Sequence, residues 1–371
     1  MANDTTTAAP NNTTLPGETS SVIPDETADT TTAAPNNTTL PGEVSSVVPD
    51  ASETAPAEKP TSATETTAND APATIPEPKQ QTEKTEPAAD KAATPIEELW
   101  ALARSHGHRE IWGVSLADPA NHVPTQIILQ KYLNANDGDI GKAKDQLRKT
   151  LDWRTKMQPL ELIKKKFNRN KFQGLGYVTV YGAADSPDPE AKDIITWNIY
   201  GSVKHVEETF GNLDEFIEWR VALMEEALQS LDISKATKPI TADHDPYKII
   251  QVHDYKSISF LRQSPVVKAA STKTIEVFAQ NYPELLKEKF FVNVPAFMGF
   301  VYALMKLFVA PKTLKKFHPM SNGANLSKEF THSKVKGLGE LIPKEYGGKG
   351  ADLNSVGKQP PLEDELEVQV D

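Results

Sequence analysis

An arginine occupies an apolar position of a helix predicted over residues 213–231. On a helical wheel the polar face carries Asp214, Glu218, Glu225 and Gln229. The opposite, apolar face carries Phe216, Leu223, Met224, Ala227 and Leu231. Arg220 falls within that apolar face, and a guanidinium keeps its charge, so its burial demands an anionic partner. The partner is either an internal carboxylate such as Glu284 or an anionic group of a ligand, unless the side chain extends to the surface.

A histidine and a tyrosine follow each other at alternate positions of a strand predicted over residues 247–253. Side chains alternate across a strand, so His253 and Tyr255 project to one face and Asp254 to the other. Their face also carries Tyr247, Ile249 and Gln251, which is too polar for a core and too aromatic for a plain surface. This composition fits the wall of a pocket. A tyrosine phenolate is an axial ligand of ferric haem, and a neighbouring imidazole can support it or share the coordination. The alternative is a hydrogen-bonded strand end.

Several classes of chemistry have no support in the sequence. It contains no Gly-rich phosphate loop, no Gly-x-Ser-x-Gly turn and no His-Glu-x-x-His pair. It also contains no cysteine, which excludes disulfides and thiolate metal sites. We therefore predict a non-enzymatic protein.

The first 94 residues differ in composition from the rest of the chain. The first aromatic residue is Trp100, and the acidic excess of residues 1–94 equals the whole formal net charge of −11. A segment with so few apolar side chains cannot offset the entropy of ordering its backbone, so we predict a disordered acidic tail over residues 1–94. The first residues lack the basic and apolar regions of a signal peptide.

After residue 94, helices come first and strands alternate with helices later. Thr94 and Pro95 mark a helix start, and periodicity up to Trp153 predicts a helical subdomain over residues 95–157. We expect strands over residues 176–181, 194–200, 247–253 and 290–294. We expect helices between them over residues 213–231, 265–281 and 298–309. This order predicts an α/β domain over residues 158–350 whose sheet has helices on one face and a ligand on the other. Residues 351–371 form an acidic C-terminal tail.

Motifs spread over residues 96–350 resemble the CRAL-TRIO family of Sec-fourteen-like lipid-transfer domains. The matching segments are residues 129–133, 139–154, 281–284, 293–295 and 342–349. The resemblance implies a mixed sheet flanked by helices around one hydrophobic cavity. Further segments, residues 198–204, 219–224 and 251–255, are similar to a fungal branch of phosphatidylinositol-transfer proteins that is also associated with haem.

That branch implies a haem site and a separate lipid headgroup site. Ferric haem b is expected to have Tyr255 as axial ligand and His253 beside it as a second possible metal ligand. Arg220, Lys289 and Tyr200, which we expect on the strand that ends at residue 200, would hold the porphyrin periphery. Glu284 and Lys316 match the acid and base that bind the inositol headgroup. The Arg-Ala-Arg run of many members is replaced by Asn-Ala-Asn at residues 134–136, which predicts weaker phosphoinositide binding. Residues 298–309 resemble the gate helix of the family.

The expected function is transfer of phosphatidylinositol between membranes in support of phosphoinositide homeostasis, with haem binding in the same cavity. The resemblance implies a cytoplasmic protein that is peripheral on endoplasmic reticulum and microsomal membranes, with no nucleic acid partner and no assigned oligomeric state. Two alternatives are a ligand-sensing adaptor for a lipid kinase and a haem-dependent oxidative-stress protein, such as a peroxidase, without lipid transfer.

Overall fold

Three helices begin the part of the chain that the computed structural model describes, which comprises residues 93–257, 264–295 and 311–364. α1 (Pro95–Ser105) starts at a capping box in which Thr94 and Glu97 each accept a hydrogen bond from the other's backbone. α2 (Val123–Ala135) and α3 (Ile140–Met157) follow, after a hairpin of β1 (Glu110–Ile111) and β2 (Val114–Ser115). Residues 1–92 of the predicted tail and the predicted gate helix lie outside the described residues.

The centre of the fold is a mixed sheet. Its strands are β4 (Gly176–Gly182), β5 (Lys192–Ile199), β6 (Ile249–Asp254), β7 (Leu286–Val292) and β8 (Phe317–Pro319), in this spatial order. β4 and β5 are antiparallel, and the remaining neighbours are parallel. The main connecting helices are α7 (Leu213–Gln229) and α8 (Pro265–Asn281), preceded by the short α6 (Val206–Phe210), and α10 (Pro311–Leu314) precedes β8. The predicted α/β class is confirmed, although the three-residue β8 was missed.

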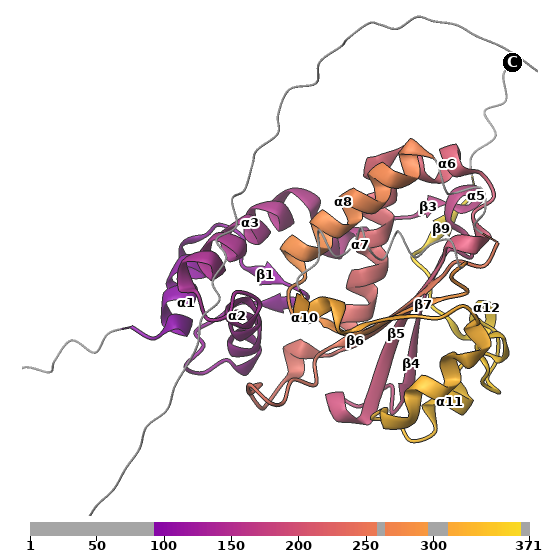
Figure 1. Cartoon of the computed structure of the whole chain (residues 1–371). Coiled ribbons are helices and arrows are strands. Elements are labelled where there is room, and N and C mark those ends of the chain that lie inside the picture. Colours follow the sequence, from indigo (N-terminus) through magenta and orange to yellow (C-terminus); the bar gives the residue numbers. More distant parts are fainter. Residues whose placement is uncertain (1–92, 258–263, 296–310, 365–371) are drawn as a thin grey trace, which may run out of the picture. The chain divides into compact units, whose positions relative to one another are not determined.

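Both faces of the sheet are covered, which corrects the expectation of helices on one face only. α7 and α8 cover one face, and a C-terminal segment with η6 (Gly323–His332), α11 (Leu338–Leu341), η7 (Lys344–Tyr346) and α12 (Leu353–Val356) covers the other (Figure 1). The second face buries Trp197, Ile250, Val252 and Phe290 against Leu326, Phe330, Ile342 and Tyr346. Apolar residues therefore alternate onto both sides of these strands.

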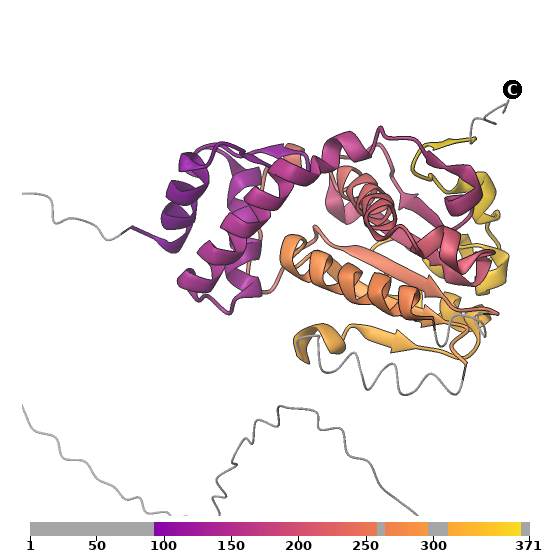
Figure 2. The same ribbon diagram turned by 90° about the horizontal axis from the view of Figure 1, so that it is seen from above.

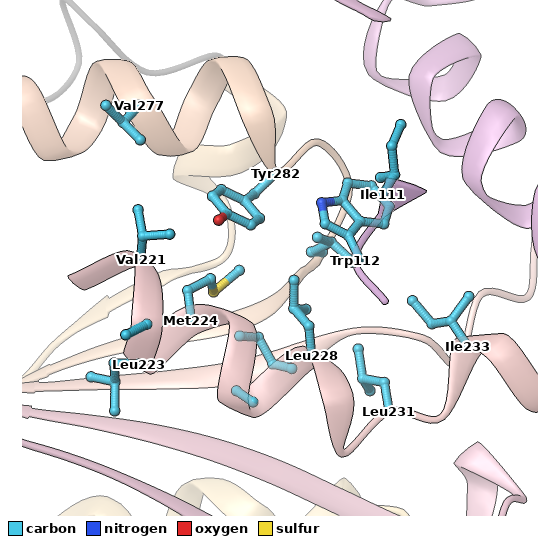
Figure 3. Packing of buried hydrophobic residues seen from close by; sticks show 14 of the residues in the cluster. Ile111, Trp112, Val221, Leu223, Met224, Leu228, Leu231, Ile233, Val277 and Tyr282 are labelled. Carbon is cyan, nitrogen blue, oxygen red and sulfur yellow. The ribbon is translucent and has the colours of Figure 1, made fainter. Parts of the chain in front are cut away.

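Buried contacts join the N-terminal helices to α7 and α8. Trp112 donates from Nε1 to the carbonyl of Asn281 at 3.2 Å and lies in the apolar cluster that also contains Met224 and Leu228 (Figure 3). Arg154 of α3 donates to the Glu225 carboxylate of α7 at 2.6 Å, and both side chains are fully buried. Glu225 belongs to the polar face of the helical wheel and is nevertheless buried, because its partner comes from a distant part of the sequence. Figure 2 shows these N-terminal helices gathered beside α8 and the sheet.

The segment after residue 350 is integrated into the fold as far as it is described. β9 (Leu362–Glu363) pairs in parallel with β3 (Phe167–Asn168), which precedes the short α5 (Arg169–Phe172). Lys358 bridges to Val178 at the edge of the sheet, and Leu353 is buried. Residues 351–364 thus pack against the domain rather than extend from it as a tail. α4 (Pro159–Leu162) joins α3 to this region. No described helix has the length and apolar character needed to cross a membrane.

Candidate functional site

Three charged side chains lie at the edge of the sheet where the parallel strands β6, β7 and β8 begin. Lys248 directly precedes β6, Glu284 lies two residues before β7, and Lys316 directly precedes β8. The Glu284 Oε2 atom is 3.8 Å from Lys316 Nζ and 3.9 Å from Lys248 Nζ. The structure therefore brings the predicted pair Glu284 and Lys316 together, and it adds Lys248, which the sequence did not reveal as a site residue.

The backbone at Glu284 adopts a conformation that is unusual for this residue type. Its φ is +56°, in the left-handed region that non-glycine residues seldom occupy. Such conformations persist only where surrounding contacts impose them, and they cluster at ligand sites. Here the imposing contact is a hydrogen bond of 2.9 Å from the buried Lys131 Nζ to the Glu284 carbonyl. We call Lys131, Asp245, Lys248, Glu284 and Lys316 the strand-start cluster.

A second group of predicted residues lies on the sheet face that α7 and α8 cover, toward the ends of β6 and β7. The His253 ring is 5.5 Å from the Tyr200 ring and 5.7 Å from the Phe291 ring. The Tyr255 ring is 5.8 Å from Tyr200 and stacks on Phe291 at 6.2 Å. Phe317 of β8 extends this group with a ring contact of 5.3 Å to Phe291. We call these residues, with Arg220 and Lys289, the aromatic cluster.

Tyr200 reaches this cluster from a turn and not from the strand. The residue begins the 3-10 helix η2 (Tyr200–Ser202), so its predicted place on the strand face was wrong. The turn approaches the end of β6 closely: a Cβ on Gly201 would lie 1.9 Å from the Lys256 carbonyl oxygen. Only glycine fits there, and this close approach places Tyr200 beside Tyr255.

Arg220 is buried among apolar side chains, as the helical wheel predicted, with 4% of its surface exposed. It donates from Nη1 to Asn198 Oδ1, and its guanidinium lies 5.5 Å from the centre of the Phe278 ring. Its Nε has no hydrogen-bond partner among the described residues, nor does any described carboxylate form an ion pair with it. The suggested pairing with Glu284 was wrong, because Glu284 faces the two lysines of the strand-start cluster.

Positive charge and burial set the protonation of the aromatic cluster. Burial, together with the charge of the nearby Arg220, lowers the pKa of Lys289 to about 7. Burial also holds the pKa of His253 well below its usual value, with Lys289 and Arg220 adding to the effect. The pKa of the Tyr255 phenol is raised by burial, although Arg220 opposes this shift. His253 is therefore neutral, and its Nε2 has no partner among the described residues.

The aromatic cluster thus suits a flat, anionic and largely apolar ligand. It offers ring faces, an unpaired imidazole nitrogen and two cationic side chains. Lys289 lies in the middle of β7 and not at its start, because the strand begins at Leu286. The described residues contain no set of three or more His, Asp or Glu side chains that could hold a bare metal ion. Two surface hollows of about 290 and 550 Å³ adjoin Trp100, far from all predicted site residues.

Comparison with known proteins identifies the family to which this fold belongs. Residues 186–348 match the CRAL/TRIO domain. The chain is 71% identical over 270 residues to "Phosphatidylinositol transfer protein SFH5" of Chaetomium globosum, covering 73% of this chain and 62% of that relative. It is 64% identical over 270 residues to the Neurospora crassa protein of the same description, covering 72% and 74%. The chain belongs to the CRAL/TRIO family.

A solved CRAL/TRIO structure agrees with the fold. "Crystal structure of Sfh5" superimposes with a TM-score of 0.58 at 28% sequence identity, covering 71% of this chain and 91% of that one. The predicted family is therefore confirmed. The names of the two relatives describe transfer proteins and not enzymes, in agreement with the prediction of a non-enzymatic chain.

The two clusters meet at the start of β8 and separate along β7. The backbone N–H of Lys289 donates to the Lys316 carbonyl at 2.8 Å, and Phe317 directly follows Lys316. Glu284 precedes β7 and Phe291 lies near its end, so their backbones are separated by roughly 20 Å at about 3.3 Å per residue. Each cluster contains residues that the sequence did not indicate, namely Lys131, Asp245 and Lys248 in one and Phe291 and Phe317 in the other. Only Lys131 carried a local signal: it is a lysine within the apolar stretch of α2.

Proposed function

We propose that this protein binds phosphatidylinositol and transfers it between membranes. The observation that carries the proposal is the Glu284–Lys316 pair at the strand starts, in a chain whose relatives are named for this transfer. A carboxylate accepts hydrogen bonds from inositol hydroxyl groups, and a lysine binds the phosphate. The protein acts in the cytoplasm and visits endoplasmic reticulum and microsomal membranes as a peripheral protein.

The aromatic cluster favours a second ligand, haem b. Tyr255 would hold the ferric iron through its phenolate, with His253 beside it, and Arg220 and Lys289 would bind the propionates. Tyr200 would contact the edge of the porphyrin. The fit rests on two features of the described residues: a buried arginine without an acidic partner and a buried imidazole nitrogen without a hydrogen bond. Each is costly to bury in isolation.

Different residues of the chain bind the two proposed ligands. A phenolate-bound ferric haem is high-spin and hard to reduce. Arg220 and Lys289 supply charge for anionic groups, and the neighbouring rings exclude water from the Tyr255 oxygen. Since these side chains line the space that acyl chains need, one protein molecule holds either haem or phosphatidylinositol, not both.

One preparation tests the proposal against its alternatives. We expect organic extracts of the purified full chain to contain phosphatidylinositol by mass spectrometry, and its absorption spectrum to show ferric haem after expression with excess haem. Vesicle assays should show phosphatidylinositol transfer. Transfer without haem would remove the second ligand, and haem without transfer would favour a haem-dependent oxidative-stress protein. Bound lipid without transfer would favour an adaptor for a lipid kinase.

A further inference from the structure

The structure assigns Lys248 to the lipid headgroup site as a third ligand-binding residue, placed opposite Lys316 across Glu284. This inference rests on the proposed phosphatidylinositol transfer and extends it by one residue. Lys248 and Lys316 lie at nearly equal distances, 3.9 and 3.8 Å, from the same oxygen, Glu284 Oε2. Both distances exceed that of a direct hydrogen bond. Lys316 Nζ donates one hydrogen bond to the Leu286 carbonyl at 2.9 Å, and Lys248 Nζ lies 3.5 Å from Asp245 Oδ2. Each ammonium group has three N–H donors, so both keep donors for a phosphate.

The three side chains are accessible to a ligand to the same degree. Exposed fractions are 24% for Lys248, 27% for Glu284 and 26% for Lys316. They come from the starts of three adjacent parallel strands, so they converge on one edge of the sheet although they are distant in sequence. An inositol phosphate placed there would meet a carboxylate with an ammonium group on each side.

The charge of the strand-start cluster favours an anionic ligand. The cluster itself has three lysines and two carboxylates, Asp245 and Glu284. The further carboxylate near Lys316, that of Glu288, has its own partner in His318 at 2.6 Å. The two accessible lysines also repel each other: the pKa of Lys316 is lowered mainly by burial and further by the charge of Lys248, while Glu284 opposes the shift. A bound phosphate relieves this repulsion.

Lys131 fixes the relative positions of the segments that carry Lys248 and Glu284. Its fully buried ammonium donates to Asp245 Oδ2 at 2.6 Å and to the carbonyls of Tyr247 and Glu284 at 2.9 Å each. All three N–H donors are thus used, and their acceptors belong to the two segments that carry Lys248 and Glu284. The position of Lys248 is therefore fixed by the fold and does not depend on a flexible loop.

The test compares lysine variants of the full chain in a vesicle assay. Donor vesicles of phosphatidylcholine contain about one-tenth phosphatidylinositol, and transfer to phosphatidylcholine acceptors is measured. We expect Lys248→Met to lower the transfer rate about tenfold, as for the loss of one charge-assisted hydrogen bond. Lys248→Arg keeps the charge and should restore transfer to within about twofold. The matched control is Lys171→Met in α5, which removes a lysine of 26% exposure that is paired with Glu215.

The outcomes separate this inference from the proposed function. Lys171→Met should transfer at the wild-type rate, and all variants should keep the wild-type melting temperature. If Lys248→Met transfers normally while Glu284→Gln does not, Lys248 is no headgroup residue and the proposed function stands. A loss that Lys248→Arg does not repair, or one that comes with a lower melting temperature, also overturns the assignment. If wild-type protein transfers no phosphatidylinositol, the proposed function and this inference fall together.

Discussion

The strand-start cluster and the aromatic cluster each contain a buried cationic side chain, but the two side chains differ in their partners. At the strand starts, the ammonium of Lys131 has three acceptors, one of them the Asp245 carboxylate. On the face below α7, Arg220 has one amide oxygen as hydrogen-bond acceptor and no acidic partner among the described residues. Both side chains are cationic and buried. The charge of Lys131 is therefore neutralised within the fold, whereas that of Arg220 has no acidic partner among the described residues, as the proposed anionic ligand requires.

The largest effect on stability is expected from removing the ammonium group of Lys131, whose three N–H donors all have acceptors. Lys131→Met leaves the buried Asp245 carboxylate and two carbonyls without their donor, which should lower the free energy of unfolding by about 3–5 kcal/mol. Chemical denaturation of the variant measures this loss. Lys164→Met serves as the control, because Lys164 pairs only with Glu161 at the surface, and its midpoint should equal that of the wild type. An unchanged Lys131→Met midpoint would mean that the three contacts do not stabilise the fold.

The next largest effect concerns the aromatic cluster. Tyr255→Phe removes the oxygen that would bind iron and keeps the ring that stacks on Phe291, so haem content should fall by at least about tenfold without loss of stability. The haem-to-protein ratio and the charge-transfer band report the change. Tyr181→Phe is a matched control, since it deletes another half-buried hydroxyl on β4, packed against the opposite face of the sheet. A variant that purifies with full haem and an unaltered band would refute Tyr255 as the ligand.

Substitutions of the headgroup pair should lower lipid transfer and leave haem content unchanged, whereas substitutions of the haem residues should lower haem content. Glu284→Gln and Lys316→Met each remove one charge at the strand starts and should lower phosphatidylinositol transfer about tenfold, as expected for one charge-assisted contact. Haem content should stay at the wild-type level, because the proposed iron ligand Tyr255 stacks on Phe291, whose backbone is roughly 20 Å from that of Glu284 along β7. Transfer assays and absorption spectra on the same preparations decide this. A parallel loss of both ligands would mean that the two regions form one site.

The sequence predicted those parts of the two regions that local patterns specify. The helix start at Thr94, the bounds of α8 and the burial of Arg220 follow from residues near one another in the chain. Contacts between distant segments were not predictable in this way. Glu225 is buried because Arg154 reaches it from α3, and Lys248 meets Glu284 only because β6 and β7 are neighbours in the sheet.

The same limit explains the errors at the sheet ends. Tyr200 continues the alternation of β5 in sequence, but the close approach of Gly201 to Lys256 turns the chain away. The cover on the second sheet face came from motifs that we interpreted only as family signatures. Its side chains, such as Leu326 and Tyr346, have no helical period long enough to predict a packed layer.

The smallest expected change in stability, that of Arg220→Met, distinguishes the aromatic cluster most clearly from the strand-start cluster. Arg220→Met removes a buried cation that has no acidic partner and leaves only Asn198 Oδ1 without a donor. The loss of that hydrogen bond costs about 1 kcal/mol, and removal of an uncompensated charge offsets it, so the stability of the ligand-free protein should change by less than about 1 kcal/mol or rise. Haem content, in contrast, should fall.

Arg154→Met is the matched control for this variant. Its guanidinium is also buried, but it pairs with the buried Glu225 at 2.6 Å and with Glu110 at 2.9 Å, so its removal should cost about 3–5 kcal/mol. Denaturation curves of the two ligand-free variants give the comparison directly. Equal losses would show that Arg220 has a structural partner as strong as Glu225, and the aromatic cluster would then be part of the core and not a ligand site.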